Sequence, residues 1–228
     1  MLKTVFFDID DTLLDFHAAE ERALRKTLET LGLDPTPETC ALYSRINAGQ
    51  WKLLEAGSAT RAQIITRRFD ILFAELGVLA DSFETQKLYE SLLAQGHDLM
   101  PGAIEVLTAL RGRYGLYIVS NGSAAVQDSR IALSGLAEYF EDIFISERIG
   151  YDKPRAEFFE VCFSRIPGFS RESAVIVGDS LTSDIRGGIN AGIRTCWYNS
   201  RGNARDGLTE PDYEVAALAE LPALFDRL

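Results

Sequence analysis

Short, almost wholly apolar segments recur along the chain, and most of them are separated by longer amphipathic ones. Near-continuous apolar runs of this length are typical of strands buried on both faces. They occupy Thr4 to Phe7, Leu116 to Val119, Ile143 to Ile145, Ala174 to Val177 and Ile193 to Trp197. Segments with helical periodicity lie between the later runs, at Pro101 to Arg113, Ser123 to Leu133, Pro154 to Ile166 and Ser183 to Ala191. The alternation predicts an α/β fold, a doubly wound, Rossmann-like parallel sheet covered by helices on both faces.

The interval between the first and second predicted strands is far longer than one crossover helix requires. Residues 16–96 have helical periodicity throughout, and Thr60 followed by Gln63 forms a candidate capping box for one of these helices. Turns are expected at residues 34–37 and at Gly57-Ser58. We therefore predict a core domain made of residues 1–15 and 97–228, with a helical cap domain inserted at residues 16–96.

Composition and charge narrow the range of partners. The 228 residues carry a formal net charge of −11, and no cluster of Lys and Arg is present, so a nucleic acid polymer is not expected as a partner. No apolar stretch approaches the roughly 20 residues of a membrane-spanning helix, and no signal peptide is apparent, so we expect a cytoplasmic protein without a membrane partner. The three cysteines show neither a disulfide framework nor metal-ligand spacing, and the sequence does not indicate an oligomeric state.

Acidic residues gather where two of the predicted strands end. Asp8 and Asp10 are two apart and so share a face at the end of the first strand, while Asp179 and Asp184 follow the fourth. Parallel strands of an open sheet present their carboxyl ends at one edge, where ligands bind. Carboxylates that lie this close repel one another, so they indicate a hard cation with oxygen ligands, and we predict Mg²⁺.

Phosphate-binding groups are expected at the same edge. Ser120 and Asn121 end the second strand and offer a hydroxyl, an amide and backbone N–H groups, while Lys153 follows the third strand and offers an ammonium group. Hydrolysis of a phosphate monoester requires a nucleophile, charge neutralisation and a proton donor together. A carboxylate nucleophile divides the displacement into two steps through an aspartyl-phosphate.

Four ordered motifs resemble those of the haloacid dehalogenase-like (HAD) phosphohydrolase superfamily. They are Asp8 to Leu13, Ser120 to Gly122, Lys153-Pro154 and Gly178 to Asp184. The helical insert stands where that superfamily carries its type 1 cap. The resemblance implies Asp8 as nucleophile and Asp10 as general acid and base. It also implies that Ser120 and Lys153 hold the phosphoryl oxygens.

The same resemblance implies the metal ligands. Mg²⁺ would be bound by the Asp8 carboxylate, the Asp10 main-chain carbonyl and Asp179. Asp184 would assist from nearby. Asp11 and Thr12, which lie between the nucleophile motif and the insert, are expected instead to cap the first inserted helix.

A narrower resemblance, to YjjG-type pyrimidine 5′-nucleotidases, covers residues 178–199 and the cap around Trp51. It implies a small-molecule substrate, a nucleoside monophosphate. Trp51 is a candidate for contact with the base, with Tyr43 and Phe69 as further stacking candidates, although core packing is the expectation for Phe69. A phosphatase for phosphoglycolate or a sugar phosphate is the main alternative. A phospho-accepting receiver domain or a catalytically dead binding module is a remote one.

Overall fold

A computed structural model describes all 228 residues of the chain. The chain forms two compact units, one made of Met1–Asp15 with His97–Leu228 and the other of Phe16–Gly96. We call the first the core unit and the second the inserted unit. No helix is both long enough and apolar enough to cross a membrane.

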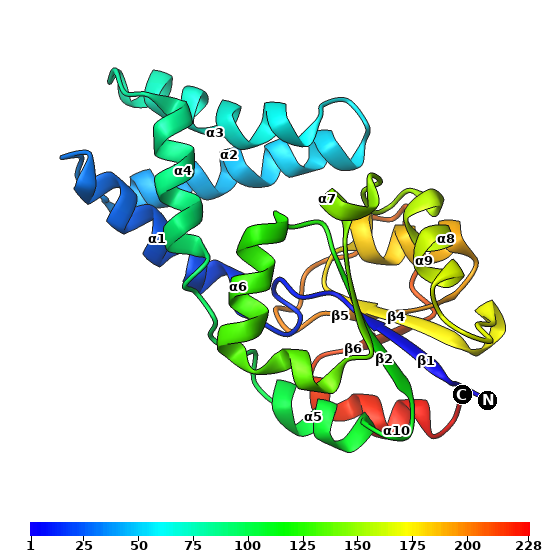
Figure 1. Ribbon diagram of the computed structural model, residues 1–228. Coiled ribbons are helices and arrows are strands. Elements are labelled where there is room, and N and C mark those ends of the chain that lie inside the picture. Colours follow the sequence, from blue (N-terminus) through cyan, green and yellow to red (C-terminus); the bar gives the residue numbers. More distant parts are fainter. The chain divides into compact units, whose positions relative to one another are not determined.

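The core unit is built on a six-stranded parallel sheet with the order β3-β2-β1-β4-β5-β6 (Figure 1). The strands are β1 Thr4–Phe7, β2 Gly115–Ser120, β3 Asp142–Ile145, β4 Ala174–Gly178, β5 Arg194–Tyr198 and β6 Tyr213–Val215. The helices are α5 Ala103–Leu110, α6 Ala124–Ser134, α7 Ser146–Ile149, α8 Ala156–Ser164, α9 Arg186–Ala191 and α10 Leu221–Phe225. Short 3₁₀ turns lie at η1 Leu136–Tyr139, η2 Arg171–Ser173 and η4 Leu218–Glu220, and a π-helical turn, η3, at Leu181–Ile185. The predicted α/β fold is confirmed.

Alternate residues of the strands supply two separate apolar layers. On β1, Val5 and Phe7 pack in one layer with residues of α5, α6 and α10, whereas Phe6 packs in the other with residues of α8. Successive side chains of a strand point to opposite faces, so both layers require apolar residues, which explains the uninterrupted apolar runs. Figure 1 shows the helices on both faces of the sheet.

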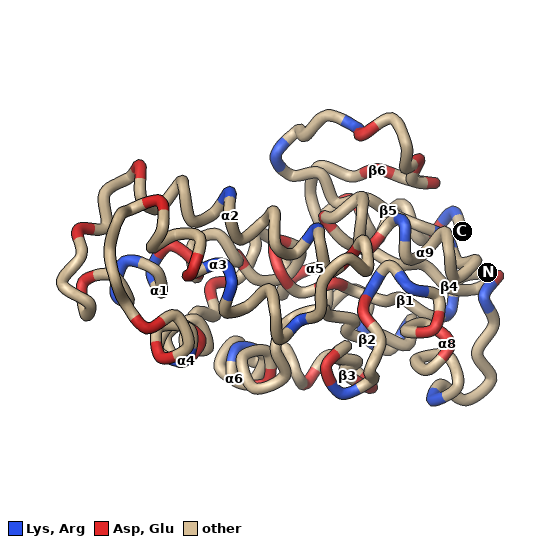
Figure 2. Tube along the Cα trace, turned by 90° about the horizontal axis from the view of Figure 1, so that it is seen from above, with Lys and Arg blue, Asp and Glu red and all other residues tan.

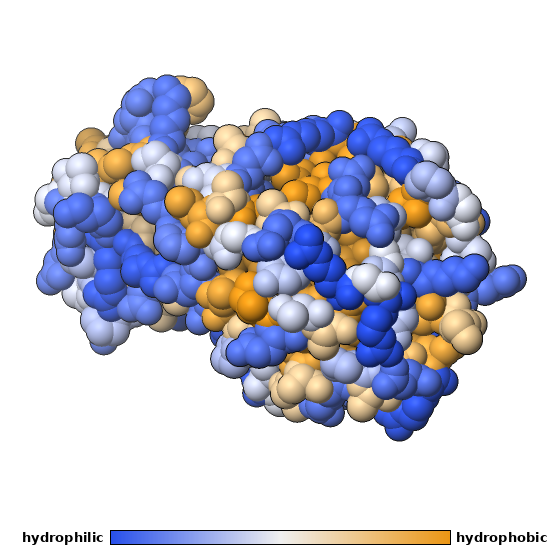
Figure 3. Space-filling model, turned by 60° about the horizontal axis from the view of Figure 1, so that its bottom comes forward, coloured by the Kyte–Doolittle hydropathy of each residue, from blue (hydrophilic) through white to orange (hydrophobic).

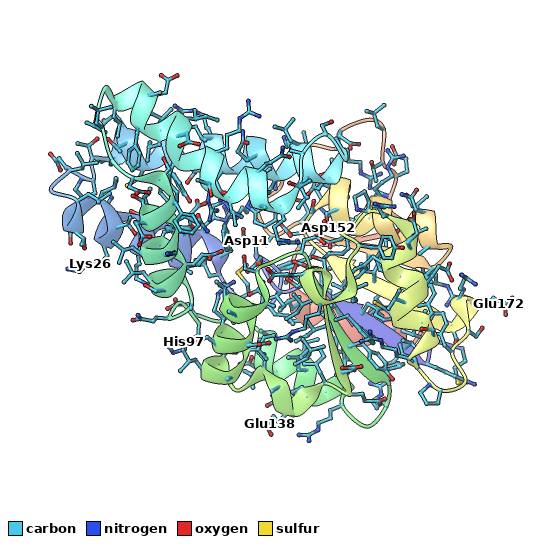
Figure 4. All side chains as sticks on the ribbon, turned by 45° about the horizontal axis from the view of Figure 1, so that its top comes forward. Asp11, Lys26, His97, Glu138, Asp152 and Glu172 are labelled. Carbon is cyan, nitrogen blue, oxygen red and sulfur yellow. The ribbon has the colours of Figure 1, made fainter.

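Strand β1 lies at the point where the strand order of the sheet reverses. From β1 the chain builds outward to β2 and β3, and it then returns to the other side of β1 with β4, β5 and β6. In open parallel sheets the crevice at such a switch point, outside the carboxyl ends of the strands, is where ligands bind. The labelled Asp11 and Asp152 lie at this edge of the core unit in Figure 4, whereas Glu138 and Glu172 precede strands at the opposite edge.

The core unit also has a long loop between β5 and β6, at residues 199–212, which carries both acidic and basic positions (Figure 2). Strand β6 beyond it has only three residues and was not predicted.

On the face turned toward the viewer in Figure 3, hydrophobic and hydrophilic residues are interspersed.

The inserted unit consists of four helices, α1 Phe16–Thr30, α2 Pro37–Glu55, α3 Arg61–Leu76 and α4 Ser82–Leu93. The predicted capping box is present, since Thr60 and Gln63 each accept a hydrogen bond from the other's backbone N–H group. Tyr43, Phe69 and Tyr89 pack together at the centre with ring centroids 5.2–5.5 Å apart.

A buried polar network also joins the four inserted helices. Glu20 of α1 accepts hydrogen bonds from Ser44 and Asn47 of α2, both at 2.6 Å. Arg68 of α3 donates to Asn47 and to Gln86 of α4, each at 2.8 Å. Because these hydrogen bonds link side chains of all four helices, the network fixes how the helices pack.

Candidate functional site

Three carboxylates converge at the switch point of the sheet. Asp8 directly follows β1, Asp179 directly follows β4, and Asp184 lies in the π-helical turn beyond it. One carboxylate oxygen from each of the three lies within 4.8 Å of the others. The sequence predicted these three residues as metal ligands, and the fold brings them together.

Glycine at position 178 makes room for Asp184. A Cβ atom built on Gly178 would lie 2.5 Å from the Asp184 Cβ and closer still to its carboxyl group, nearer than real Cβ atoms approach. The Asp184 carboxylate is also held by the backbone N–H of Ser180, at 3.1 Å. Asp184 is therefore packed against the end of β4 and is almost fully buried.

Lys153 joins two of these carboxylates. Its ammonium group donates to Asp8 Oδ1 at 2.7 Å, to Asp184 Oδ1 at 2.6 Å and to the carbonyl oxygen of Val119 at 2.8 Å. Its side chain is 1% exposed. A buried lysine with its three donors directed at three acceptors is well compensated, so this is no solvated surface residue.

Asn121 holds the loop that carries Lys153. Its side-chain amide donates to the Lys153 carbonyl oxygen and its side-chain oxygen accepts from the Lys153 N–H, both at 2.8 Å. The sequence suggested Asn121 as a phosphate-binding residue. In the structure the Asn121 side chain lies against the main chain of Lys153, and so it positions the ammonium group.

Burial and the closeness of like charges determine the pKa values in the cluster of three carboxylates. Burial, together with the nearby Asp184 carboxylate, raises the pKa of Asp8 to about 8 even though Lys153 lowers it. Burial and the charges of Asp184 and Asp8 also raise the pKa of Asp179 well above its usual value. Burial by itself would lower the pKa of Lys153, but Asp184 and Asp8 raise it above the ordinary lysine value.

This set of groups fits a magnesium ion. Three ionised carboxylates beside one ammonium would leave two negative charges uncompensated. A divalent cation would neutralise them, and every donor in the cluster is a carboxylate oxygen, the kind of ligand that Mg²⁺ prefers.

Asp10 lies outside the three-carboxylate group and has different partners. Its carboxylate forms an ion pair with Arg130 and accepts a hydrogen bond from Gln127 Nε2 at 2.7 Å. Gln127 Nε2 also lies 2.9 Å from the hydroxyl oxygen of Ser120, which accepts a further bond from the Gly122 N–H. Gln127 and Arg130 were not predicted as site residues, although their three-residue spacing on a helix after the Ser120 motif could have indicated a shared face.

The structure corrects the expectation for Asp11 and Thr12. Helix α1 begins only at Phe16, so these two residues do not cap it. They lie instead in a tight turn, in which Asp11 has a positive φ of 57° and Thr12 N–H bonds to the Ile9 carbonyl. The Asp11 carboxylate lies 3.4 Å from Arg201 in the β5–β6 loop.

The candidate base-contacting residues belong to the inserted unit. Trp51 is half-buried on α2, and the guanidinium carbon of Arg61 lies 5.5 Å from its ring centroid. Tyr43 and Phe69 are both fully buried among the inserted helices. Core packing of Phe69 is thus confirmed, and neither ring offers a stacking surface, because both are covered by their neighbours.

Comparison with known proteins identifies a hydrolase family and several similar proteins. Residues 2–192 match the haloacid dehalogenase-like hydrolase family. YfnB of Bacillus subtilis is 42% identical over 219 residues, which cover 96% of this chain and 93% of YfnB. A crystal structure of YfnB bound to magnesium covers 99% of both chains with a TM-score of 0.95.

Two further relatives are pyrimidine 5′-nucleotidases. PynA of Streptococcus pneumoniae is 39% identical, over 99% of this chain and 95% of PynA. YjjG of Escherichia coli is 32% identical, over 96% of each chain. Because the family match covers most of the chain and these relatives are similar over almost all of it, the chain belongs to the haloacid dehalogenase-like hydrolases.

Proposed function

We propose that the protein is a Mg²⁺-dependent phosphomonoester hydrolase that acts on nucleoside 5′-monophosphates through an aspartyl-phosphate. The observation that carries this proposal is the convergence of Asp8, Asp179 and Asp184 with the Lys153 ammonium at the carboxyl edge of the sheet. The nucleotide part rests on similarity to PynA and YjjG over almost the whole chain.

In the first chemical step, a carboxylate oxygen of Asp8 attacks phosphorus and the ester P–O bond breaks. Lys153 donates hydrogen bonds to Asp8 and Asp184, so it holds the nucleophile in place and offsets negative charge on the phosphoryl oxygens. Ser120 is proposed to contribute its hydroxyl to the same oxygens, and Asn121 keeps the Lys153 loop in register with it. The departing alkoxide takes a proton from Asp10.

The second step regenerates the enzyme. Asp10 takes a proton from water, the water oxygen attacks phosphorus, and the bond between phosphorus and Asp8 breaks to release phosphate. A magnesium ion held by Asp8, Asp179, Asp184 and the main-chain carbonyl of Asp10 would neutralise charge that develops on the phosphoryl group.

The inserted unit is proposed to act as a cap that selects the substrate, with Trp51 in contact with the base. Its ring is half-buried and not enclosed by other aromatic side chains, unlike those of Tyr43 and Phe69. An aromatic face suits any nucleobase, so Trp51 would favour nucleotides over small metabolites. Replacing Trp51 by Leu should raise KM for nucleotides and leave kcat/KM for phosphoglycolate unchanged.

The proposal is tested by hydrolysis of a panel of phosphate esters with Mg²⁺. The panel contains pyrimidine and purine 5′-monophosphates, phosphoglycolate and sugar phosphates. We expect the highest kcat/KM for a pyrimidine nucleotide, no activity in chelator and none for Asp8→Asn. The matched control is Asp226→Asn, which removes an exposed carboxylate of the same unit.

Each outcome bears on a different part of the proposal. Preference for phosphoglycolate or a sugar phosphate would overturn the nucleotide assignment and leave the chemistry intact. Full turnover by Asp8→Asn, or full activity without a divalent ion, would overturn the mechanism. A protein that hydrolyses no phosphate ester would contradict the whole proposal and favour a binding module.

A further inference from the structure

Helix α6 places a glutamine and an arginine against the Asp10 carboxylate. Gln127 and Arg130 are three positions apart, so they share one face of the helix. Arg130 Nη1 pairs with Asp10 Oδ1, and Gln127 Nε2 donates to Asp10 Oδ2 at 2.7 Å. The two helix residues also contact each other, since Arg130 Nη1 donates to Gln127 Oε1 at 3.1 Å.

The burial of this pair needs an explanation beyond packing. Gln127 and Arg130 are each 1% exposed, and they lie on a short helix whose other buried residues include Val126 and Ile131. Removing a guanidinium from water is costly unless the charge is compensated, and an apolar residue would fill the space at less cost. The Asp10 carboxylate, whose side chain remains 29% exposed, pairs with the guanidinium and compensates its charge.

The backbone after β2 also accommodates Gln127. A Cβ atom at Gly122 would lie 2.7 Å from the Gln127 Cγ and Cδ atoms and closer still to Nε2. Any side chain at position 122 would therefore displace the glutamine. Gly122 ends the Ser120 motif, and its lack of a side chain is what lets the Gln127 amide reach both the Ser120 hydroxyl and Asp10.

We propose that Gln127 and Arg130 are positioning residues that fix the Asp10 carboxylate for proton transfer with the leaving group. This inference rests on the proposed function. Asp10 is not part of the cluster of Asp8, Asp179 and Asp184. Its side-chain contacts come instead from α6. A carboxylate has about four lone-pair directions. The two donors occupy one on each oxygen and leave others for the substrate.

The proposal predicts a dependence on the leaving group. An aliphatic alkoxide, such as the 5′ oxygen of a nucleotide, must gain a proton as the P–O bond breaks, and Asp10 supplies it. A p-nitrophenolate ion departs without a proton. Mispositioning of Asp10 should therefore slow phosphorylation of Asp8 by the aliphatic ester and leave phosphorylation by the aryl ester almost unchanged.

The experiment compares kcat/KM for a nucleoside 5′-monophosphate and for p-nitrophenyl phosphate, because kcat/KM reports the steps up to the first irreversible one. The variants are Gln127→Leu, Arg130→Met and Gly122→Ala, which disturb the same contacts in three ways. Gln127→Leu removes no charge and keeps the volume, so it tests the proposal even where Arg130→Met fails to fold. Asp128→Asn is the matched control, since it breaks only an exposed ion pair of α6 with Arg148.

We expect a fall of about 10-fold or more for the nucleotide, since general acid catalysis is typically worth about 10²–10⁴-fold. The expected change for p-nitrophenyl phosphate is within about 3-fold, and Arg130→Lys should recover part of the loss because a cation still faces Asp10. An equal fall for both esters, with the wild type active and Asp8→Asn inactive, would overturn the positioning role and leave the proposed function standing. A wild type that hydrolyses neither ester would overturn both.

Discussion

Replacement of Lys153 by methionine should destabilise the metal-free protein and strongly reduce turnover, yet leave magnesium binding intact. The substitution removes an ammonium group that donates to Asp8, Asp184 and the Val119 carbonyl, and it keeps an unbranched apolar stem. Loss of one partner from a buried ion pair typically costs about 3–5 kcal/mol, because the other charge remains buried without compensation. At about 2–4 °C per kcal/mol for a chain of this size, Tm should fall by about 6–20 °C.

The pH and metal dependence of this loss follow from the same contacts. A carboxylate that takes up a proton no longer needs the ammonium, so the fall in Tm should be smaller at about pH 6 than at about pH 9. Magnesium binds the carboxylates and not Lys153, so it should raise the Tm of Lys153→Met at least as much as that of the wild type. Loss of one preorganised charge contact at a reacting group commonly lowers kcat by about 10²–10³-fold, and we expect a loss of at least this size.

Differential scanning calorimetry with and without Mg²⁺, at both pH values, measures these effects. Lys3→Met removes an exposed lysine of the core unit and serves as the control. A Tm for Lys153→Met within about 2 °C of that control would show that the ammonium contacts do not stabilise the fold, since the shift in Tm scales with the free energy of the lost contacts. A variant that loses its response to Mg²⁺ would show instead that Lys153 is needed to assemble the metal-binding group.

Three further predictions concern the carboxylate group and the inserted unit. Gly178→Ala should weaken Mg²⁺ binding by about 10–100-fold in a calorimetric titration, since its Cβ would displace the Asp184 carboxylate; unchanged affinity would contradict the close approach. The metal-free protein should lose stability as pH rises between about 4 and 8, because the folded state, in which the pKa of Asp8 is raised from 3.8 to about 8, binds a proton there that the unfolded chain has released. The Tm increase on addition of Mg²⁺ should grow over the same window, and an increase that shrinks with pH would refute the assignment. Arg68→Leu should destabilise the inserted unit by about 2–5 kcal/mol, measured as faster proteolysis between residues 16 and 96, because it leaves buried oxygens on two neighbouring helices without a donor; an effect no larger than that of the exposed Arg67→Leu would contradict this.

The sheet was predictable because both of its faces are buried. The five predicted strands agree with the observed ones to within about two residues at each end, the usual uncertainty of element boundaries. Strand β6 gave no such signal, since its three residues follow a long polar loop and only one of them is fully buried. The helix predicted from Ser183 also begins differently. The Ser180 N–H bonds to the Asp184 carboxylate and the Ser183 N–H to the Ser180 hydroxyl, and these contacts shape a π-helical turn before α9 starts at Arg186.

The acidic part of the site was predictable because strand ends place it. Asp8 and Asp179 follow adjacent parallel strands, so the topology alone brings them together. Gln127 and Arg130 cannot be found in that way, because they lie within a helix whose periodicity predicts only that it covers the sheet. Their role depends on the close approach of α6 to Gly122, a tertiary contact that periodicity does not encode.

The proposed mechanism requires Asp8 to carry the phosphoryl group during turnover. The most direct measurement traps that intermediate by rapid quenching of the enzyme with a nucleoside monophosphate and Mg²⁺, followed by borohydride reduction and peptide mass spectrometry. We expect reductive conversion of Asp8 to homoserine, dependent on substrate and absent in Asp8→Asn. Steady turnover with Asp8 unmodified, or with the modification at another carboxylate, would contradict it.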